Sequence, residues 1–337
     1  MYLGYIHSFR GLAIVYVVLG HCFALSGVSD DYWGVWFNVI SGGTVLFVFI
    51  SGYLFEYVFC NRFNYRVFIR KKFLHVFVPY VFMSAPALLY VLWKNESTYF
   101  PSYSDYGEMA SYAASYFFNG RMITGYWFVP FVFVVFLLAP VWRFLASFEY
   151  VLVVLSVVGV FLASIVHRPY GNIGVFHNLV YYLPVFWVGM VVSKKSDSLN
   201  SFFSDYWWVF SLGVVLLLLV QTWGQGHLGQ YRKSFFEYSG FDLQIFQKLF
   251  VCFSLVGLLQ VCSLFERFWG FLADNSFGIY FVHVYFVFLL KYAFEFYEVS
   301  GWLAFGLGFV FCMLASLLVV VSAKGVFGRY SRYIVGS

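Results

Sequence analysis

The sequence predicts an all-α integral membrane protein whose single domain, residues 1–337, is a bundle of about ten transmembrane helices. Three observations predict this fold. Hydrophobic residues make up 62% of the 337 residues. Charged residues make up only 10%, which is too few to cover the surface of a water-soluble domain of this size. Apolar runs long enough to cross a bilayer follow one another along the whole chain.

The ten apolar runs leave no room for a long soluble insertion, and no internal repeat relates them. Met1 leads directly into the first run without a basic segment or a small-residue cleavage site, so we expect that run to be kept as a helix. The predicted spans are 5–26, 38–60, 73–93, 126–146, 148–166, 176–193, 207–223, 245–265, 276–296 and 301–322.

The loop cations predict the orientation in the membrane, because Lys and Arg are enriched in cytoplasmic loops. If both termini are cytoplasmic, that side receives Arg62, Arg66, Arg70, Lys71, Lys72, Arg143, Lys194, Lys195, Arg267, Lys324, Arg329 and Arg332. The other side receives the smaller set of Lys94, Arg121, Arg168, Arg232, Lys233, Lys248 and Lys291. The net charge of +5 is spread over these short loops, so we expect the lipid bilayer, and not a nucleic acid, as the partner.

The five cysteines predict neither disulfides nor a metal site. All lie inside or at the ends of apolar runs, and no pair has the spacing of metal ligands. Free cysteine behaves as a small apolar side chain in such a setting, so no metal is expected.

Arg10 and His21 are the ionisable residues of the first span that point to chemistry. Eleven helical steps turn through three full turns plus about 20°, so both side chains lie on one face, about 16 Å apart along the axis. Ionisable groups at such depth are costly and usually face a cavity or a partner. The alternative is an interhelical hydrogen bond for His21 and an Arg10 that extends to the headgroups.

Further motifs follow this pair in order. They are Gly43-Thr44-Val45-Leu46-Phe47-Val48-Phe49-Ile50-Ser51-Gly52-Tyr53-Leu54, Phe68-Ile69-Arg70-Lys71-Lys72-Phe73-Leu74-His75 with Pro79-Tyr80, Tyr126-Trp127-Phe128 with Pro140, and Ser276-Phe277-Gly278-Ile279-Tyr280-Phe281-Val282-His283. With these motifs and with Arg10 and His21, which have ten residues between them, the chain resembles the acyltransferase-3 family of membrane acyltransferases from residue 5 to about 285. Two positions depart from the common pattern, since His7 stands where Asp is frequent and His75 where a second Arg is usual.

The resemblance implies that His21 is catalytic, either as the base that deprotonates an acceptor hydroxyl or as a covalent carrier of the acyl group. Arg10 would hold a phosphate of the donor or polarise a carbonyl. Arg70, Lys71 and Lys72 would bind the phosphates of the donor, although a topology signal alone would explain these three cations. Residues that would line the substrate cavity are His283, Tyr280, Trp127 and Ser51, and for His283 an interhelical hydrogen bond is the alternative.

The same resemblance implies a cytoplasmic acyl-CoA donor, typically acetyl-CoA, with succinyl and longer groups also used in the family. The acceptor would be an envelope glycan or a lipid-linked oligosaccharide, the location the bacterial inner membrane, and the partners proteins of polysaccharide assembly. We expect Arg10 and His21 to line one cavity that opens toward the 61–72 loop. Its outer mouth would be formed by segment 94–125 or 224–244. The alternative function is a glycan transporter, flippase or polymerase, which would not explain the spacing of Arg10 and His21.

Overall fold

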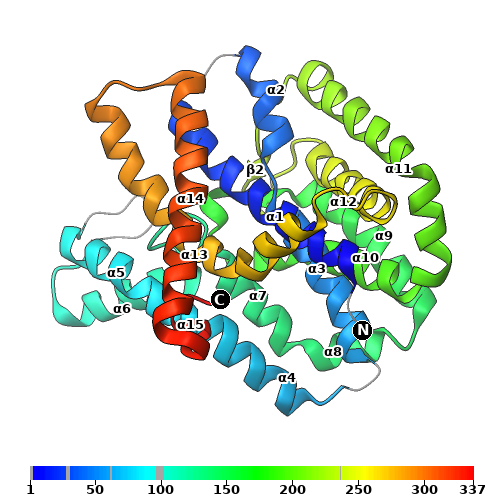
Figure 1. Cartoon of the computed structure of the whole chain (residues 1–337), viewed down its shortest axis with the longest axis horizontal. Helices are drawn as coiled ribbons and strands as arrows, with labels where there is room; N and C mark the ends of the chain where they lie inside the picture. The colour runs from blue at the N-terminus through cyan, green and yellow to red at the C-terminus, as the bar shows by residue number, and fades with distance from the viewer. Residues whose placement is uncertain (1–2, 28–30, 61–62, 96–101, 236) are drawn as a thin grey trace.

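The computed structural model describes residues 3–27, 31–60, 63–95, 102–235 and 237–337. Arg62 of the predicted basic loop and residues 96–101 of the predicted outer segment lie outside the described residues. The described chain is almost entirely helical, and Figure 1 shows the other helices gathered around α1 (Gly4–Cys22).

The helices after α1 are α2 (Asp31–Ile40), α3 (Thr44–Leu54), α4 (Tyr65–Lys72), α5 (Val78–Lys94), α6 (Tyr106–Asn119), α7 (Phe128–Leu137), α8 (Ala139–Leu145), α9 (Glu149–Val166), α10 (Val175–Lys194), α11 (Ser196–Leu219), α12 (Leu243–Val261), α13 (Glu266–Phe296), α14 (Gly301–Phe327) and α15 (Ser331–Ile334). Wider helical turns extend α3 at Phe55–Phe59, join α4 to α5 at Phe73–Phe77 and extend α11 at Val220–Gly224. The strands β1 (Arg168–Pro169) and β2 (Arg232–Lys233) pair in parallel.

Nine helical stretches of the described chain are long and apolar enough to cross a membrane, or ten if the bent pair α7–α8 counts as one span. The nine are Gly4–Ser26, Gly34–Phe59, Tyr65–Lys94, Glu149–Val166, Val175–Lys194, Ser196–Gly224, Leu243–Val261, Glu266–Phe296 and Gly301–Ile334. The predicted all-α bundle of about ten spans is therefore confirmed.

Several spans differ from the prediction, three of them for identifiable reasons. The run predicted at 126–146 bends by 58° between α7 and α8, where Pro140 cannot donate a backbone hydrogen bond. Helix α13 begins at Glu266, ten residues early, because polar side chains such as Asp274 interrupt the apolar run without interrupting the helix. Helix α11 likewise begins at Ser196, well before the predicted 207.

Lys248 is not the loop residue that the orientation argument assumed. It lies inside α12 and is fully buried. Its Nζ donates to the carbonyl oxygens of Asn38 (3.1 Å) and Val39 (2.7 Å) at the end of α2. Those carbonyls have no intrahelical partner, because the chain turns at Gly42 with φ +83° before α3 begins. Lys248 therefore stabilises the break between α2 and α3 and carries no information on topology.

Helices α3 and α10 approach so closely that only glycine fits at their contact. A Cβ on Gly52 would lie 1.9 Å from the carbonyl oxygen of Phe186, and one on Gly189 would lie 2.1 Å from that of Phe49. Small residues at helix contacts are a common feature of membrane bundles. The packing of α3 against α10 therefore explains the role of the glycine in the Ser51-Gly52 motif.

The first turns of α1 pack against the start of α13 in the same way. A Cβ on Gly11 would lie 2.2 Å from the carbonyl oxygen of Trp269. Both chain ends meet at this place: His7 Nε2 lies 3.2 Å from Asp274 Oδ1, and Ser337 Oγ donates to the Asp274 carbonyl at 3.0 Å. The N- and C-terminal ends therefore lie at the same end of the bundle, and α1 runs from there to the opposite end.

Candidate active site

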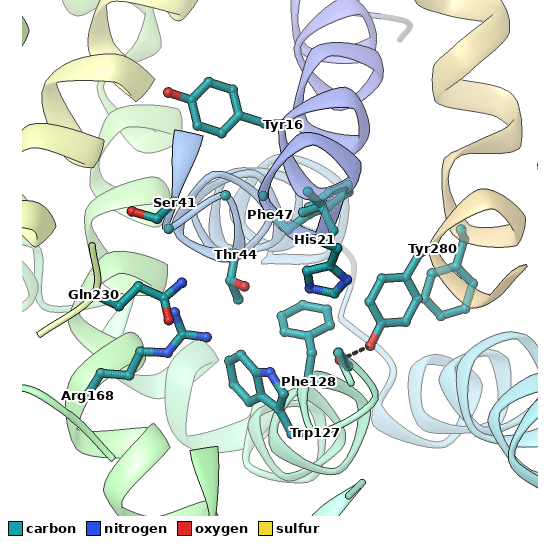
Figure 2. A pocket seen from close by; sticks show the side chains of 16 residues that line it. Tyr16, His21, Ser41, Thr44, Phe47, Trp127, Phe128, Arg168, Gln230 and Tyr280 are labelled. Atoms are coloured by element: carbon teal, nitrogen blue, oxygen red, sulfur yellow. Dashed lines mark hydrogen bonds between the residues drawn. The ribbon is translucent and has the colours of Figure 1, made fainter. Parts of the chain in front are cut away.

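A cavity of about 80 Å³ lies at the C-terminal end of α1, away from the chain termini (Figure 2). Its walls come from α1, the α2–α3 break, the start of α7, α13 and two loops. The lining residues are Tyr16, Val17, Gly20, His21, Ser41, Gly42, Gly43, Thr44, Phe47, Gly125, Trp127, Phe128, Arg168, Gln230, Phe277 and Tyr280. Gly125 and Gln230 come from the two segments, 94–125 and 224–244, that the sequence predicts at the mouth of the cavity.

His21 and His283 form a hydrogen-bonded pair in the wall of this cavity. His283 Nε2 lies 3.0 Å from His21 Nδ1, and the ring centroids are 5.0 Å apart. His283 is fully buried, whereas His21 is partly exposed to the cavity. Among the described residues, no group of three His, Cys, Asp or Glu side chains comes close enough to hold a metal ion.

The hydrogen bonds of the pair determine which nitrogen of His21 is basic. His283 Nδ1 lies 2.8 Å from the Ile279 carbonyl oxygen, which can only accept, so Nδ1 carries the proton. Nε2 of a neutral His283 is then an acceptor, and the proton between the two rings belongs to Nδ1 of His21. The remaining nitrogen of His21, Nε2, keeps its lone pair. A general base or a nucleophile requires such a lone pair.

The turn before α7 holds the His21 ring in place. Gly125 has φ +95°, and a Cβ at this position would lie 2.7 Å from His21 Cε1. The hydroxyl of Tyr280 donates to the Gly125 carbonyl at 2.7 Å, the contact drawn dashed in Figure 2. The hydroxyl of Tyr126 donates to the Phe281 carbonyl at 2.8 Å, so two tyrosines join this turn to α13. Only glycine fits between this turn and His21.

Two of the four predicted cavity residues line the cavity, and two do not. Trp127 and Tyr280 are in its wall. Ser51 is not, because it lies seven residues beyond Thr44 on α3, about 10 Å further along the helix. His283 is not either, because it lies behind His21 as its hydrogen-bond partner. The alternative predicted for His283, an interhelical hydrogen bond, describes its placement, although the partner is His21 itself.

Arg10 lines a different hollow, and the prediction of one cavity shared with His21 is wrong. Its Nη2 donates to the Ala273 carbonyl at 2.7 Å and lies 3.9 Å from Asp274 Oδ1. The hollow, of about 150 Å³, is lined by Leu3, Ile6, His7, Arg10, Leu54, Tyr57 and Val58. Although both side chains lie on one face of α1, the two hollows share no lining residue.

The predicted donor-binding cations of α4 have unequal surroundings. Arg70 and Lys71 are exposed. Lys72 instead lies over the Phe136 ring, with Nζ 4.4 Å from its centroid, and near the Phe68 ring at 5.5 Å. None of the three lines the cavity of His21. Arg70 and Lys71 therefore remain predicted phosphate ligands, and Lys72 is largely occupied by aromatic packing.

Arg168, Gln230 and Ser41 are cavity residues that the sequence analysis did not select. Arg168 is only 5% exposed, although it lies in a loop. Arg168 is one of the seven cations that the sequence assigns to the side of the membrane opposite the termini. Nothing in the sequence distinguishes it from the other six as the one whose side chain is buried. Gln230 and Ser41 lack any charge or motif that would have indicated a role.

Comparison with known proteins identifies the family. The family model described as an acyltransferase domain, that of the acyltransferase-3 family, matches residues 3–321. No curated protein and no solved structure matches the chain. The matched region contains α1 with Arg10 and His21, and it extends through the pairing of His21 with α13. The chain therefore belongs to the acyltransferase-3 family of membrane acyltransferases.

Proposed function

We propose that this membrane acyltransferase moves an acetyl group from acetyl-CoA to a hydroxyl of an envelope glycan or of its lipid-linked precursor. The acceptor oxygen attacks the thioester carbonyl, His21 Nε2 takes the hydroxyl proton, and the CoA thiolate leaves and is protonated. The observation that carries the proposal is the His21–His283 pair, which leaves a lone pair on the one ring nitrogen that is not hydrogen-bonded. Family membership supports acyl transfer and disfavours the glycan transporter, flippase or polymerase.

We propose that His21 acts as a base and not as a covalent acyl carrier, because a base fits the hydrogen bonding between His21 and His283. When His21 takes a proton at Nε2, its Nδ1–H still donates to His283, which stabilises the imidazolium without any rearrangement. A covalent acyl-histidine uses the same lone pair and predicts a burst of CoA release without acceptor. Rapid mixing with acetyl-CoA alone therefore separates the two roles.

The donor is proposed to enter from the end of the bundle where the chain termini lie, which we assign to the cytoplasm of a bacterium with the protein in its inner membrane. Arg70 and Lys71 are exposed cations suited to the phosphates of CoA. The acyl arm would then pass along α1 to His21. Phe277 stands on this route, between Asp274 and the cavity, and stacks on Tyr280 with centroids 5.8 Å apart. Movement of this ring would open the route.

The test is transfer of labelled acetyl from acetyl-CoA by protein purified in detergent, with glycan or lipid-linked glycan as acceptor. Labelled O-acetyl product and release of CoA are expected, whereas a transporter would give neither. Labelled succinyl-CoA in the same assay examines the acyl group. Absence of product with every acyl donor and acceptor would contradict the proposal.

A further inference from the structure

Arg168 presents a buried cation to the cavity opposite His21. Its Nε donates to Asn172 Oδ1 at 2.5 Å, and its guanidinium lies over the rings of Trp127 at 5.1 Å and Tyr182 at 5.7 Å. These contacts hold the plane of the group and leave its two terminal nitrogens, with four N–H donors, on the cavity side. Figure 2 shows the guanidinium facing the open space, with Gln230 and Trp127 on either side.

No carboxylate of the described residues lies within 4 Å of this guanidinium. Asp242 is an acid whose charge acts on Arg168, but each of its oxygens already accepts a hydrogen bond from another group. Oδ2 accepts from the Tyr181 hydroxyl at 2.7 Å, and Oδ1 accepts from the Gln244 backbone N–H at 2.8 Å. A buried guanidinium is costly unless its N–H groups are paired, so a site that keeps one facing a cavity is suited to an anion that arrives there.

The polar neighbours of Arg168 in the cavity also offer donors. Gln230 Oε1 accepts from Arg232 Nη2 at 2.6 Å and Nε at 3.2 Å. Because arginine only donates, it is the amide oxygen that faces Arg232, and the amide NH₂ is left for the cavity. Ser41 Oγ accepts from Gln244 Nε2 at 2.5 Å, which leaves the hydroxyl hydrogen of Ser41 free to donate.

The pairing of β1 with β2 gathers further positive charge at the same place. The register pairs Arg168 with Arg232 and Pro169 with Lys233. Arg168 is buried, and Arg232 is exposed. The loops after α9 and before α12 thus bring cations from two distant parts of the sequence together. Such a concentration of one charge sign raises the local concentration of an oppositely charged ligand.

We propose that Arg168, with the Gln230 amide and the Ser41 hydroxyl, binds an anionic group of the acceptor and thereby directs a neighbouring hydroxyl toward His21. The acceptor would then be an acidic sugar with a carboxylate or a sugar phosphate such as the lipid-linked precursor carries. Both present the oxygens that a guanidinium binds in bidentate fashion. This inference rests on the proposed function, because it concerns the second substrate of that reaction.

The experiment compares three acceptors of matched size with purified protein and acetyl-CoA: an alkyl glucoside, the corresponding alkyl glucuronide, and a glucosyl phosphate alkyl ester. Binding is measured by titration calorimetry and transfer by labelled acetyl. The wild type should bind one of the two anionic acceptors about tenfold more tightly than the neutral one, as expected for a charged hydrogen bond. The stronger of the two anionic ligands identifies carboxylate or phosphate as the source of the charge.

Arg168→Gln should remove this preference, raising the Kd and KM of the anionic acceptor about tenfold and leaving the neutral one unchanged. Arg168→Lys should keep part of it, because lysine retains the charge and loses the bidentate geometry. Lys94→Gln, which removes an exposed cation outside the cavity, is the matched control and should change neither. If Arg168→Gln does not fold, Gln230→Ala tests the same site and should weaken anion binding alone.

Three results would overturn the inference. In the first, the wild type would bind the anionic and neutral acceptors equally. In the second, Arg168→Gln would slow transfer to both alike, and this would indicate that Arg168 stabilises the developing oxyanion. In the third, the variants would lose thermal stability and keep the preference for anions, which would indicate that Arg168 only clamps Trp127 and Tyr182. Release of CoA in the presence of each acceptor serves as an independent readout. If the wild type releases no CoA with any acceptor, the proposed function fails, and the calorimetric preference still decides the inference.

Discussion

The two ends of α1 each carry an ionisable side chain on the same face, but in different surroundings. At the end near the chain termini, Arg10 donates to a backbone carbonyl and lies near the largely exposed Asp274. At the opposite end, the one side-chain hydrogen bond of His21 within the described parts of the chain is with a second, fully buried imidazole, that of His283. Each lines a separate hollow.

This difference suggests a division of labour along one helix. A partly exposed arginine at the edge of the bundle, whose Nη2 lies as far as 3.9 Å from the Asp274 carboxylate, can still attract the phosphates of a donor. A hydrogen-bonded imidazole that presents a ring nitrogen with a lone pair to a cavity is suited to moving a proton. The predictions below test whether binding of the donor and proton transfer are separated in this way.

The largest effect is expected at His21. Replacement by alanine removes the lone pair at Nε2, and loss of a positioned base costs on the order of 10²-fold or more in kcat. The measurement is transfer of labelled acetyl by the purified variant, with thermal stability in detergent as the check on folding.

His75→Ala is the matched control for His21. It also removes an imidazole from the bundle, but its ring contacts Tyr333 and does not line the cavity. Its kcat should remain close to that of the wild type. Acetylation by His21→Ala at the rate of the His75 variant would refute the assignment of the base.

His283 should show a smaller, positional effect, because it acts through His21. His283→Leu removes the acceptor for His21 Nδ1–H, and loss of such an orienting partner typically costs about 10- to 100-fold. His283→Gln places an amide oxygen near the former Nε2 and should recover much of the rate. Equal losses in the two variants would indicate a packing role, and kcat should change more than the KM for acetyl-CoA.

The sequence predicted the fold class, most of the spans and the family, because length, hydropathy and a family motif are local properties. The catalytic role of His21 stays a prediction. It could not predict that His21 and His283, 262 positions apart, would hydrogen-bond. That contact joins α1 to α13, two helices that also approach each other closely at Gly11. Helical periodicity correctly placed Arg10 and His21 on one face, but it contains no information on what fills the space between them.

Arg168 illustrates a second limit of the sequence. A loop arginine on a membrane protein is ordinarily solvated, and hydropathy gives no sign when one is folded inward. Its burial follows from the pairing of β1 with β2, two residues each, and from the rings of Trp127 and Tyr182 that receive the guanidinium. Such a contact between two short loops has no periodic signature.

A moderate effect confined to binding is expected at Arg70 and Lys71. Replacing both by Gln should raise the KM for acetyl-CoA severalfold and leave kcat unchanged, because contacts with remote phosphates stabilise ground and transition states alike. Added salt should weaken wild-type binding in the same direction. Lys72→Gln is the contrast: since Lys72 packs on Phe136, it should lower thermal stability instead. An unchanged KM in the double variant would leave these cations as topology signals.

The smallest effect is a pH dependence of stability at Asp242. This acid lies near Arg168 and is fully buried, whereas Asp274, at the other end of α1, is largely exposed. Burial raises the pKa of Asp242 from 3.8 to about 6, despite the Tyr181 hydroxyl and Arg168, which act to lower it. The folded protein therefore binds this proton more tightly than the unfolded chain does. The resulting stabilisation is complete below about pH 4, declines as the pH rises to about 6, and is absent above.

Asp242→Asn should remove this decline, so the Tm of the variant minus that of the wild type should rise by several degrees between pH 4 and pH 6.5. The difference is the proper readout because His167, whose pKa burial lowers to about 4, makes the wild type more stable with rising pH over the same range. A flat difference curve would mean that Asp242 is ionised throughout and pairs with the positive charge of the cavity, which would leave Arg168 less available to an acceptor.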